Sequence, residues 1–101
     1  MADTYIFGPS KTLAVSTASV PLLTEDIKPT SGKYQGLQAE VAEIYAVGAL
    51  YKEYGGGAAT TASIPMAAGD SFVIEGYQNI KDLHFIRNTS DTTIVWSPGY
   101  R

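Results

Sequence analysis

The residues best suited to do chemistry lie in one short stretch, DLHFIRNTSDTTIVW at positions 82–96. It contains the single histidine of the chain, His84, two positions after Asp82. An imidazole and a carboxylate catalyse proton transfer when a third group and a cleft orient them. Residues two apart in a strand share a face without pointing at each other. We therefore expect His84 to be a packed or hydrogen-bonded residue, with no catalytic residue in the chain and no enzyme activity.

The composition argues against a metal or cofactor site. The chain has no cysteine, which excludes disulfides, thiol nucleophiles and thiolate metal ligands. One histidine cannot build the two- or three-histidine site of a small β-barrel metalloenzyme. The acidic residues lack the alternating spacing of a calcium loop, and the glycine run at 55–57 lacks the lysine of a phosphate-binding loop. We expect no metal and no cofactor.

Charge and hydropathy also limit the partners. The formal net charge is -3, and the seven lysines and arginines are scattered singly, whereas nucleic acid binding needs basic clusters. No apolar run approaches the roughly 18 residues of a membrane helix. The start, MADTYIFGPSK, has no basic segment followed by an apolar one. We expect a soluble, unsecreted protein that binds neither nucleic acid nor membranes.

The elements that would position these side chains are predicted to be short β-strands. Residues 83–87 and 92–96 are rich in β-branched and aromatic residues and flank the turn-forming sequence NTSD, which predicts an antiparallel hairpin. Alternation puts apolar side chains on both faces, with Phe85 opposite in direction to Ile86 and Trp96 opposite to Val95. This pattern favours an inner strand pair of a sandwich, or a sheet whose second face is covered by a neighbouring chain.

Further strands are predicted upstream. Residues 63–66 and 71–75 flank the turn sequence AAGD, and an early strand over 11–17 ends before Pro21, which marks a sheet edge or exit. Residues 24–33 and 55–62 are predicted to be surface loops because they are rich in Gly, Pro, Ser, Thr and small residues.

Residues 36–54 fit both a helical and a strand pattern. Gly48 would cost a helix roughly 1 kcal/mol relative to alanine, whereas in a strand it can mark a bulge or bend. We favour two strands broken near Glu43, because every other ordered segment is predicted to be a strand. The expected fold is all-β: a small antiparallel β-sandwich or jelly-roll-like barrel formed by one domain, 1–101, with an extended N-terminal segment 1–11 and a C-terminal tail 97–101.

Tyrosine is frequent, with seven in 101 residues. Tyr5, Tyr34, Tyr54 and Tyr100 lie at predicted loops and ends, where an amphipathic ring is favoured at protein interfaces and can also stack on sugars. Tyrosines that only cover the ends of a small core are equally compatible with these positions.

Three segments together carry a family resemblance: KTLAVSTASVPLL, then KYQGLQAEVA, then SIPMAAGDSFVIEGYQNIKDLHFIRNTSDTTIVW. Their order resembles that of small accessory structural proteins of tailed bacteriophages, of the head-decoration or capsid-cement type. The resemblance lies in pattern and length rather than in an invariant motif. It implies a β-sandwich or jelly-roll module that forms a homo-oligomer, with a trimer favoured, and binds the outside of an icosahedral shell, bracing adjoining subunits of the major capsid protein.

The same resemblance implies a location on the capsid surface of the virion after synthesis in the host cytoplasm. Six residues are the expected interface: Tyr5, Phe7, His84, Arg87, Trp96 and Tyr100. Two other classes stay open. A head-tail connector or tail component would share the fold and form a larger ring, and a carbohydrate-binding module would use Tyr51, Tyr54 and Trp96 as its aromatic platform.

Overall fold

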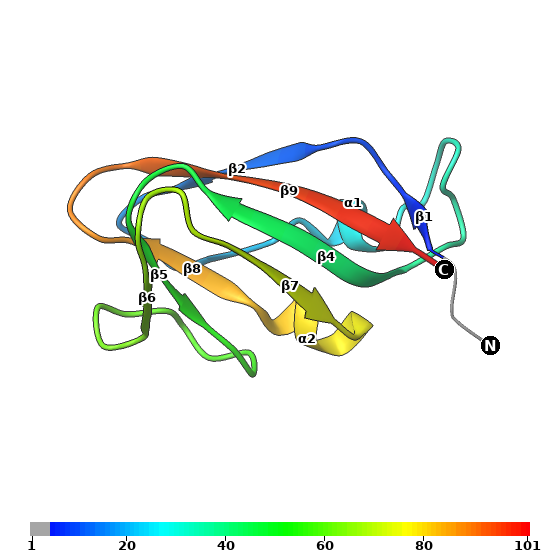
Figure 1. Ribbon diagram of the computed structural model, residues 1–101. Helices are drawn as coiled ribbons and strands as arrows, with labels where there is room; N and C mark the ends of the chain where they lie inside the picture. Colours follow the sequence, from blue (N-terminus) through cyan, green and yellow to red (C-terminus); the bar gives the residue numbers. More distant parts are fainter. Residues whose placement is uncertain (1–4) are drawn as a thin grey trace.

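The computed structural model describes residues 5–101, which form two antiparallel β-sheets packed face to face (Figure 1). The first sheet contains β1 (Ile6–Phe7), β2 (Lys11–Val15), β4 (Ala39–Ala46), β7 (Ser71–Glu75) and β9 (Thr92–Tyr100). The second contains β3 (Val20–Pro21), β5 (Leu50–Glu53), β6 (Ile64–Met66) and β8 (His84–Arg87). The short helices α1 (Thr24–Ile27) and α2 (Tyr77–Asp82) complete the elements of this range. The predicted all-β sandwich is confirmed.

The strand order is that of a jelly roll. In the first sheet it is β1-β9-β4-β7, with β2 also paired to β9, and in the second it is β3-β8-β5-β6. The pairs β2–β9, β3–β8, β4–β7 and β5–β6 are nested one inside another, as in a long hairpin rolled over on itself. This nesting is the pattern of the eight-stranded jelly roll, to which β1 is added.

The predicted hairpin of residues 83–87 and 92–96 is wrong, because β8 and β9 belong to different sheets. Residues 88–91 carry the chain across the sandwich, as residues 47–49 and 67–70 do between other strands. The crossing lets Phe85 of β8 and Ile94 of β9 face each other across the core, and both are fully buried. Two strands paired in one sheet would place these side chains beside each other rather than face to face.

The two strands predicted within residues 36–54 are confirmed, but the position of the break is wrong. β4 runs through Glu43 to Ala46, and the chain turns at residues 47–49. Gly48 lies in this turn, where an added Cβ would be 2.5 Å from Oγ1 of Thr92. The sharp crossing therefore depends on a glycine that lets the backbone approach the start of β9.

The predicted surface loop at residues 24–33 is wrong in its first part, since residues 24–27 form α1. The cause is Ile27, which is buried in the core at the end of the sandwich where α1 contacts α2 and its buried Ile80. The helix α2 was not predicted, because its six residues are too few to show a helical pattern. Neither helix in residues 5–101 has the length and apolar character to cross a membrane.

The predicted C-terminal tail is also wrong, because residues 97–100 continue β9. Proline and glycine suggested a tail, yet the carbonyl of Pro98 accepts a hydrogen bond from Gly8 N–H at 2.9 Å, and Gly99 pairs with Phe7. Of the predicted N-terminal extension, residues 6–7 are β1 and Lys11 begins β2, while residues 1–4 lie outside the described range. Strand pairing thus extends close to both ends of the described chain.

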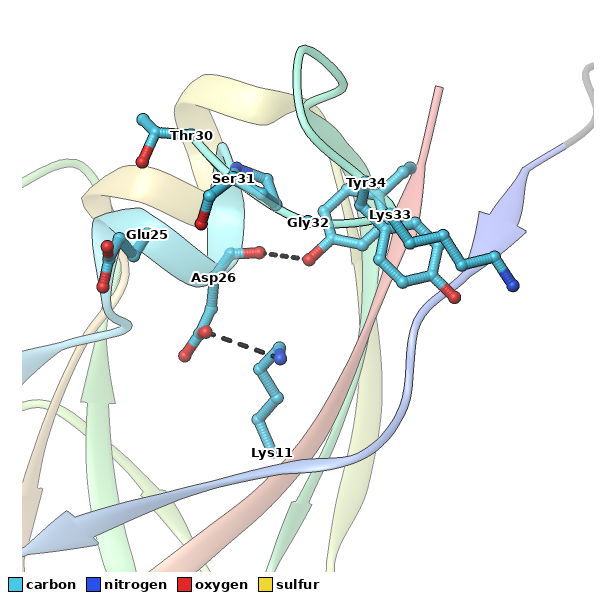
Figure 2. A pocket seen from close by; sticks show the side chains of 10 residues that line it. Lys11, Glu25, Asp26, Thr30, Ser31, Gly32, Lys33 and Tyr34 are labelled. Carbon is cyan, nitrogen blue, oxygen red and sulfur yellow. Dashed lines mark hydrogen bonds and ion pairs between the residues drawn. The ribbon is translucent and has the colours of Figure 1, made fainter.

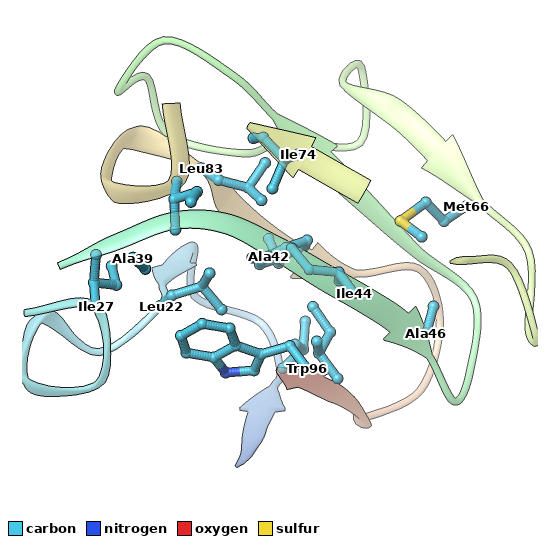
Figure 3. Close-up of a cluster of buried hydrophobic side chains, with 14 of the residues drawn as sticks. Leu22, Ile27, Ala39, Ala42, Ile44, Ala46, Met66, Ile74, Leu83 and Trp96 are labelled. Carbon is cyan, nitrogen blue, oxygen red and sulfur yellow. The ribbon is translucent and has the colours of Figure 1, made fainter. Parts of the chain in front are cut away.

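The core fills the space between the sheets. Its fully buried members come from both sheets and both helices, and they include Val15, Ile27, Ile44, Leu50, Ile80, Leu83, Phe85 and Ile94. Figure 3 shows part of this cluster. Figure 3 also shows the Trp96 indole among the core side chains under β4. Ile94 and Trp96 share one face of β9, as predicted from the sequence, and the structure shows that this face points inward.

Gly99→Ala tests the close packing on β9. An added Cβ would overlap Cγ1 of Val41 and lie 3.1 Å from Cε1 of Phe7, so we expect a loss of about 1–3 kcal/mol in the free energy of unfolding. The loss should be smaller in a Val41→Ala background, and urea unfolding measures both. Gly57→Ala is the control, since its new Cβ meets only Glu53 Cγ at 3.8 Å. An equal loss in both backgrounds would contradict the packing argument.

Candidate functional site

The structure does not bring the six predicted interface residues to one surface. Trp96 and Tyr100 are 2% and 1% exposed, because both point inward from β9. Their burial corrects the prediction, since a residue inside the core contacts no partner without unfolding. It also removes Trp96 from the predicted aromatic platform for a sugar. The residue types suggested a surface position. Burial is decided instead by the alternation of side chains along β9, which turns both residues inward.

Tyr100 instead holds the end of the sandwich together. Its hydroxyl donates a hydrogen bond of 2.6 Å to the Asp26 carbonyl, and its ring stacks on Tyr34 at 4.9 Å between centroids. Burial raises the pKa of Tyr100 above its ordinary value of 10.0, and the nearby charge of Asp26 adds to the effect. The neutral, donating phenol is the form that the fold stabilises.

A polar pocket of about 380 Å³ lies beside this contact (Figure 2). Lys11 and Lys33 line it together with the loop residues 29–32, and the Lys11 ammonium lies 3.5 Å from an Asp26 carboxylate oxygen. The Tyr34 ring is stacked against the Tyr100 ring. The Lys33 ammonium lies 5.6 Å from the centroid of the Tyr34 ring. The ion pair of Lys11 with Asp26 and the hydrogen bond from Tyr100 to the Asp26 carbonyl thus fix α1 against β2 and β9.

His84 and Arg87 make local contacts. Nδ1 of His84 lies 2.8 Å from the Asp82 carbonyl, and since a carbonyl only accepts, this nitrogen carries the proton. Arg87 donates to an Asp91 carboxylate oxygen at 2.7 Å across the β8–β9 crossing. Neither contact leaves an acid–base pair poised for catalysis. Within residues 5–101, no cluster of three or more His, Cys, Asp or Glu could hold a metal ion.

Part of the outer face of the second sheet, at β8, is covered by the chain itself, while Pro21 of β3 and Pro65 of β6 stay exposed. Residues 54–63 leave β5, where the Gly56 N–H donates to the Asp82 carbonyl at 3.1 Å. The Ala59 N–H then donates to Ser19 Oγ at 2.8 Å, beside β3. Since β8 lies between β5 and β3, the loop crosses the outer side of β8. Ala59, which belongs to this loop, is buried. His84 and Ile86 on that face are therefore only partly exposed.

The outer face of the first sheet is different, because its apolar side chains stay exposed. Four of the eight large, exposed hydrophobic residues in the described range lie on it or at its end, at 45–62% exposure: Phe7, Tyr45, Val47 and Val73. Strand register joins them through Val41, Val95 and the small residues Ser97 and Gly99 of β9. We call this set, with Glu43 and Glu75, the outer face of the first sheet.

A shallow depression of about 280 Å³ lies near the middle of this outer face. It is lined by Ser10, Glu43, Tyr45, Val95, Trp96 and Ser97. Glu43 projects between Val73 on β7 and Ser97 on β9, its partners in the strand register. Among residues 5–101, no side chain makes a hydrogen bond or ion pair with the Glu43 carboxylate.

Of the predicted interface residues, Phe7 lies on the outer face of the first sheet, and Tyr5, two residues earlier, is partly buried. The sequence analysis missed Tyr45, Val47 and Val73. The pattern that would have found Val73 is the run SFVIE, in which Phe72 and Ile74 lie on one face and Val73 adds an apolar group to the other. Contacts of Tyr5, Phe7, His84 and Arg87 with a partner stay predictions.

Comparison with known proteins found no matching protein-family model, no matching curated protein and no matching solved structure.

Tyr100→Phe tests the hydrogen bond to Asp26. Because the folded pKa is raised, the stabilisation is complete below pH 10 and is lost as the pH rises above 10 through the folded pKa. We expect the variant to lose about 1 kcal/mol at pH 7 and to show a smaller further loss between neutral and alkaline pH. Urea unfolding across that range measures both effects. Tyr54→Phe, at an exposed tyrosine, is the control; an unchanged alkaline loss in Tyr100→Phe would refute the assignment.

Proposed function

We propose that this chain is a structural protein of a bacteriophage virion that binds the outside of the capsid and braces adjoining capsid subunits. In this proposal the major capsid protein is the partner, and the outer face of the first sheet is the surface that meets it. The protein acts by contact area and shape, without a chemical step.

The observation that carries the proposal is the exposed apolar character of that face. Phe7, Tyr45 and Val73 each keep at least 45% of their surface in water, and they come from three different strands of one sheet. Burying apolar surface contributes roughly 25 cal/mol per Å², and a continuous exposed apolar patch is typical of a protein-binding surface. In the other sheet, by contrast, residues 54–63 cross the outer side of the central strand β8.

The jelly-roll topology is compatible with this role but does not by itself indicate it. Jelly rolls occur in viral capsid proteins and in lectins alike, and a fold does not fix a function. The resemblance of the three sequence segments to phage decoration proteins supports the capsid role. A head-tail connector or tail component would use the same apolar face in a larger ring, so oligomer symmetry separates the two.

The carbohydrate-binding alternative has less support. Of the three aromatic residues predicted for its platform, Trp96 is in the core, and the Tyr54 ring already has the Lys52 ammonium 5.4 Å from its centroid. A sugar-binding face needs exposed rings side by side, with polar groups around them.

Val73→Asp tests the binding face. A carboxylate on the exposed face opposes burial against a partner, so we expect binding to capsid shells assembled without this protein to fall at least tenfold in co-sedimentation. Val73→Thr keeps the β-branched shape and should weaken binding less. Leu23→Asp is the matched control, since Leu23 is as exposed as Val73, at 57% against 62%, and lies outside this face. Unchanged binding by a folded Val73→Asp variant would overturn the assignment of the face.

Light scattering after size-exclusion chromatography tests the oligomer. We expect a mass three times that of the monomer, as fits a protein that braces three adjoining capsid subunits. A larger closed ring would favour the connector or tail role instead. A monomer at all concentrations would contradict the trimer.

A further inference from the structure

We propose that the depression beside Glu43 receives one lysine or arginine side chain of the partner protein, whose cationic group pairs with the Glu43 carboxylate. The identification of that partner as capsid protein rests on the proposed function, whereas the chemistry of the depression stands on the geometry alone. Glu43 would then be the residue that sets the position and specificity of docking.

The position of Glu43 makes a paired cation necessary. Along β4 its neighbours on the same face are Val41 and Tyr45, and across the sheet they are Val73 and Ser97. A partner that covers the exposed Val73 and Tyr45 also covers the carboxylate between them. An ionised carboxylate buried without a partner costs several kcal/mol. Because no described side chain pairs with Glu43, the docking protein has to supply the positive charge.

The charge of the face points the same way. In the described strand rows that form it, the ionised side chains are Glu43 and Glu75, and both are negative. A second copy docked through the same face would bring two more carboxylates to the contact, and like charges facing each other oppose association. A partner with a basic residue is therefore favoured over self-association through this face.

The lining of the depression suits a long basic side chain. Val95 and Tyr45 line the depression and offer apolar contact for the methylene stem, which lysine and arginine commonly bury. Ser10 and Ser97 belong to the same lining, and a serine hydroxyl can accept a hydrogen bond from an ammonium or guanidinium group beside Glu43. The small size of Ser97, next to Gly99 on β9, leaves room for that group between β4 and the edge of the sheet.

Two other places in the structure offer weaker support for a docking site. In the pocket at Lys11 and Asp26 these two charges are paired and the two tyrosines are stacked on each other. The Lys52 ammonium already lies over the Phe72 ring, 3.6 Å from its centroid. The depression at Glu43 combines the exposed Tyr45 and the partly exposed Val95 with a carboxylate that no side chain of residues 5–101 pairs with.

The first test uses a peptide probe and needs no capsid. Acetyl-Val-Thr-Lys-Thr-Val-amide is titrated into ¹⁵N-labelled protein, beside the same peptide with norleucine in place of lysine. We expect the lysine peptide to shift the amide resonances of Val95 and Ser97 at lower concentration than the norleucine peptide. Glu43→Gln should abolish this preference, and Glu75→Gln should retain it. Equal shifts by both peptides, or a preference that survives Glu43→Gln, would overturn the inference.

The second test uses capsid shells and separates the two proposals. Glu43→Gln should weaken shell binding about tenfold or more and flatten its salt dependence, whereas Glu75→Gln, at the edge of the face, should change it less than twofold. Wild-type binding that Glu43→Gln leaves intact would overturn this inference and leave the proposed function standing. If the wild type does not bind shells, the proposed function fails, and the peptide titration alone decides the role of Glu43.

Discussion

The pairing of β9 along both of its edges is the constraint on which the rest of the structure depends. On one edge β9 pairs with β4 from Ile94 to Tyr100, and on the other it pairs with β2 and then β1. Its inward side chains fill the core, while on the outer side Ser97 and Gly99 are small enough for Val41 and Phe7 to pack across the strand. The strand thus forms both the centre of the hydrophobic core and the floor of the exposed face.

Much of the fold could be predicted from the sequence because strand formation is local. Alternation and turn residues located β6, β7, β8 and most of β9, and they placed Ile94 and Trp96 on one face. The sheet to which each strand belongs could not be predicted in this way. The sequence NTSD serves a hairpin and a crossing equally well, and only the packing of Phe85 against the opposite sheet decides between them. For the same reason, SPGYR resembled a tail until its pairing with β1 and β4 was seen.

The candidate site was harder to predict than the fold, since exposure is a property of the whole molecule. Tyr100 and Val73 illustrate the difficulty: the tyrosine was expected at the surface and is 1% exposed, whereas the valine, an apolar residue within a strand, is 62% exposed. Nothing local to residues 54–63 shows that this loop crosses the outer side of β8. The position of Glu43 among apolar neighbours likewise depends on the register of β4 with β7 and β9.

The nested strand order also governs when the chain can fold. Val15 pairs with Thr92, and Val20 with Phe85, so the early strands find their partners only in the last quarter of the described chain. Closing such long loops before any contact forms is entropically costly and slows folding. During translation β2 leaves the ribosome well before β9, the strand with which it pairs, and β4 can pair with β7 but lacks its second neighbour until β9 is made. The sandwich is therefore completed only after synthesis of β9, in a late and cooperative step.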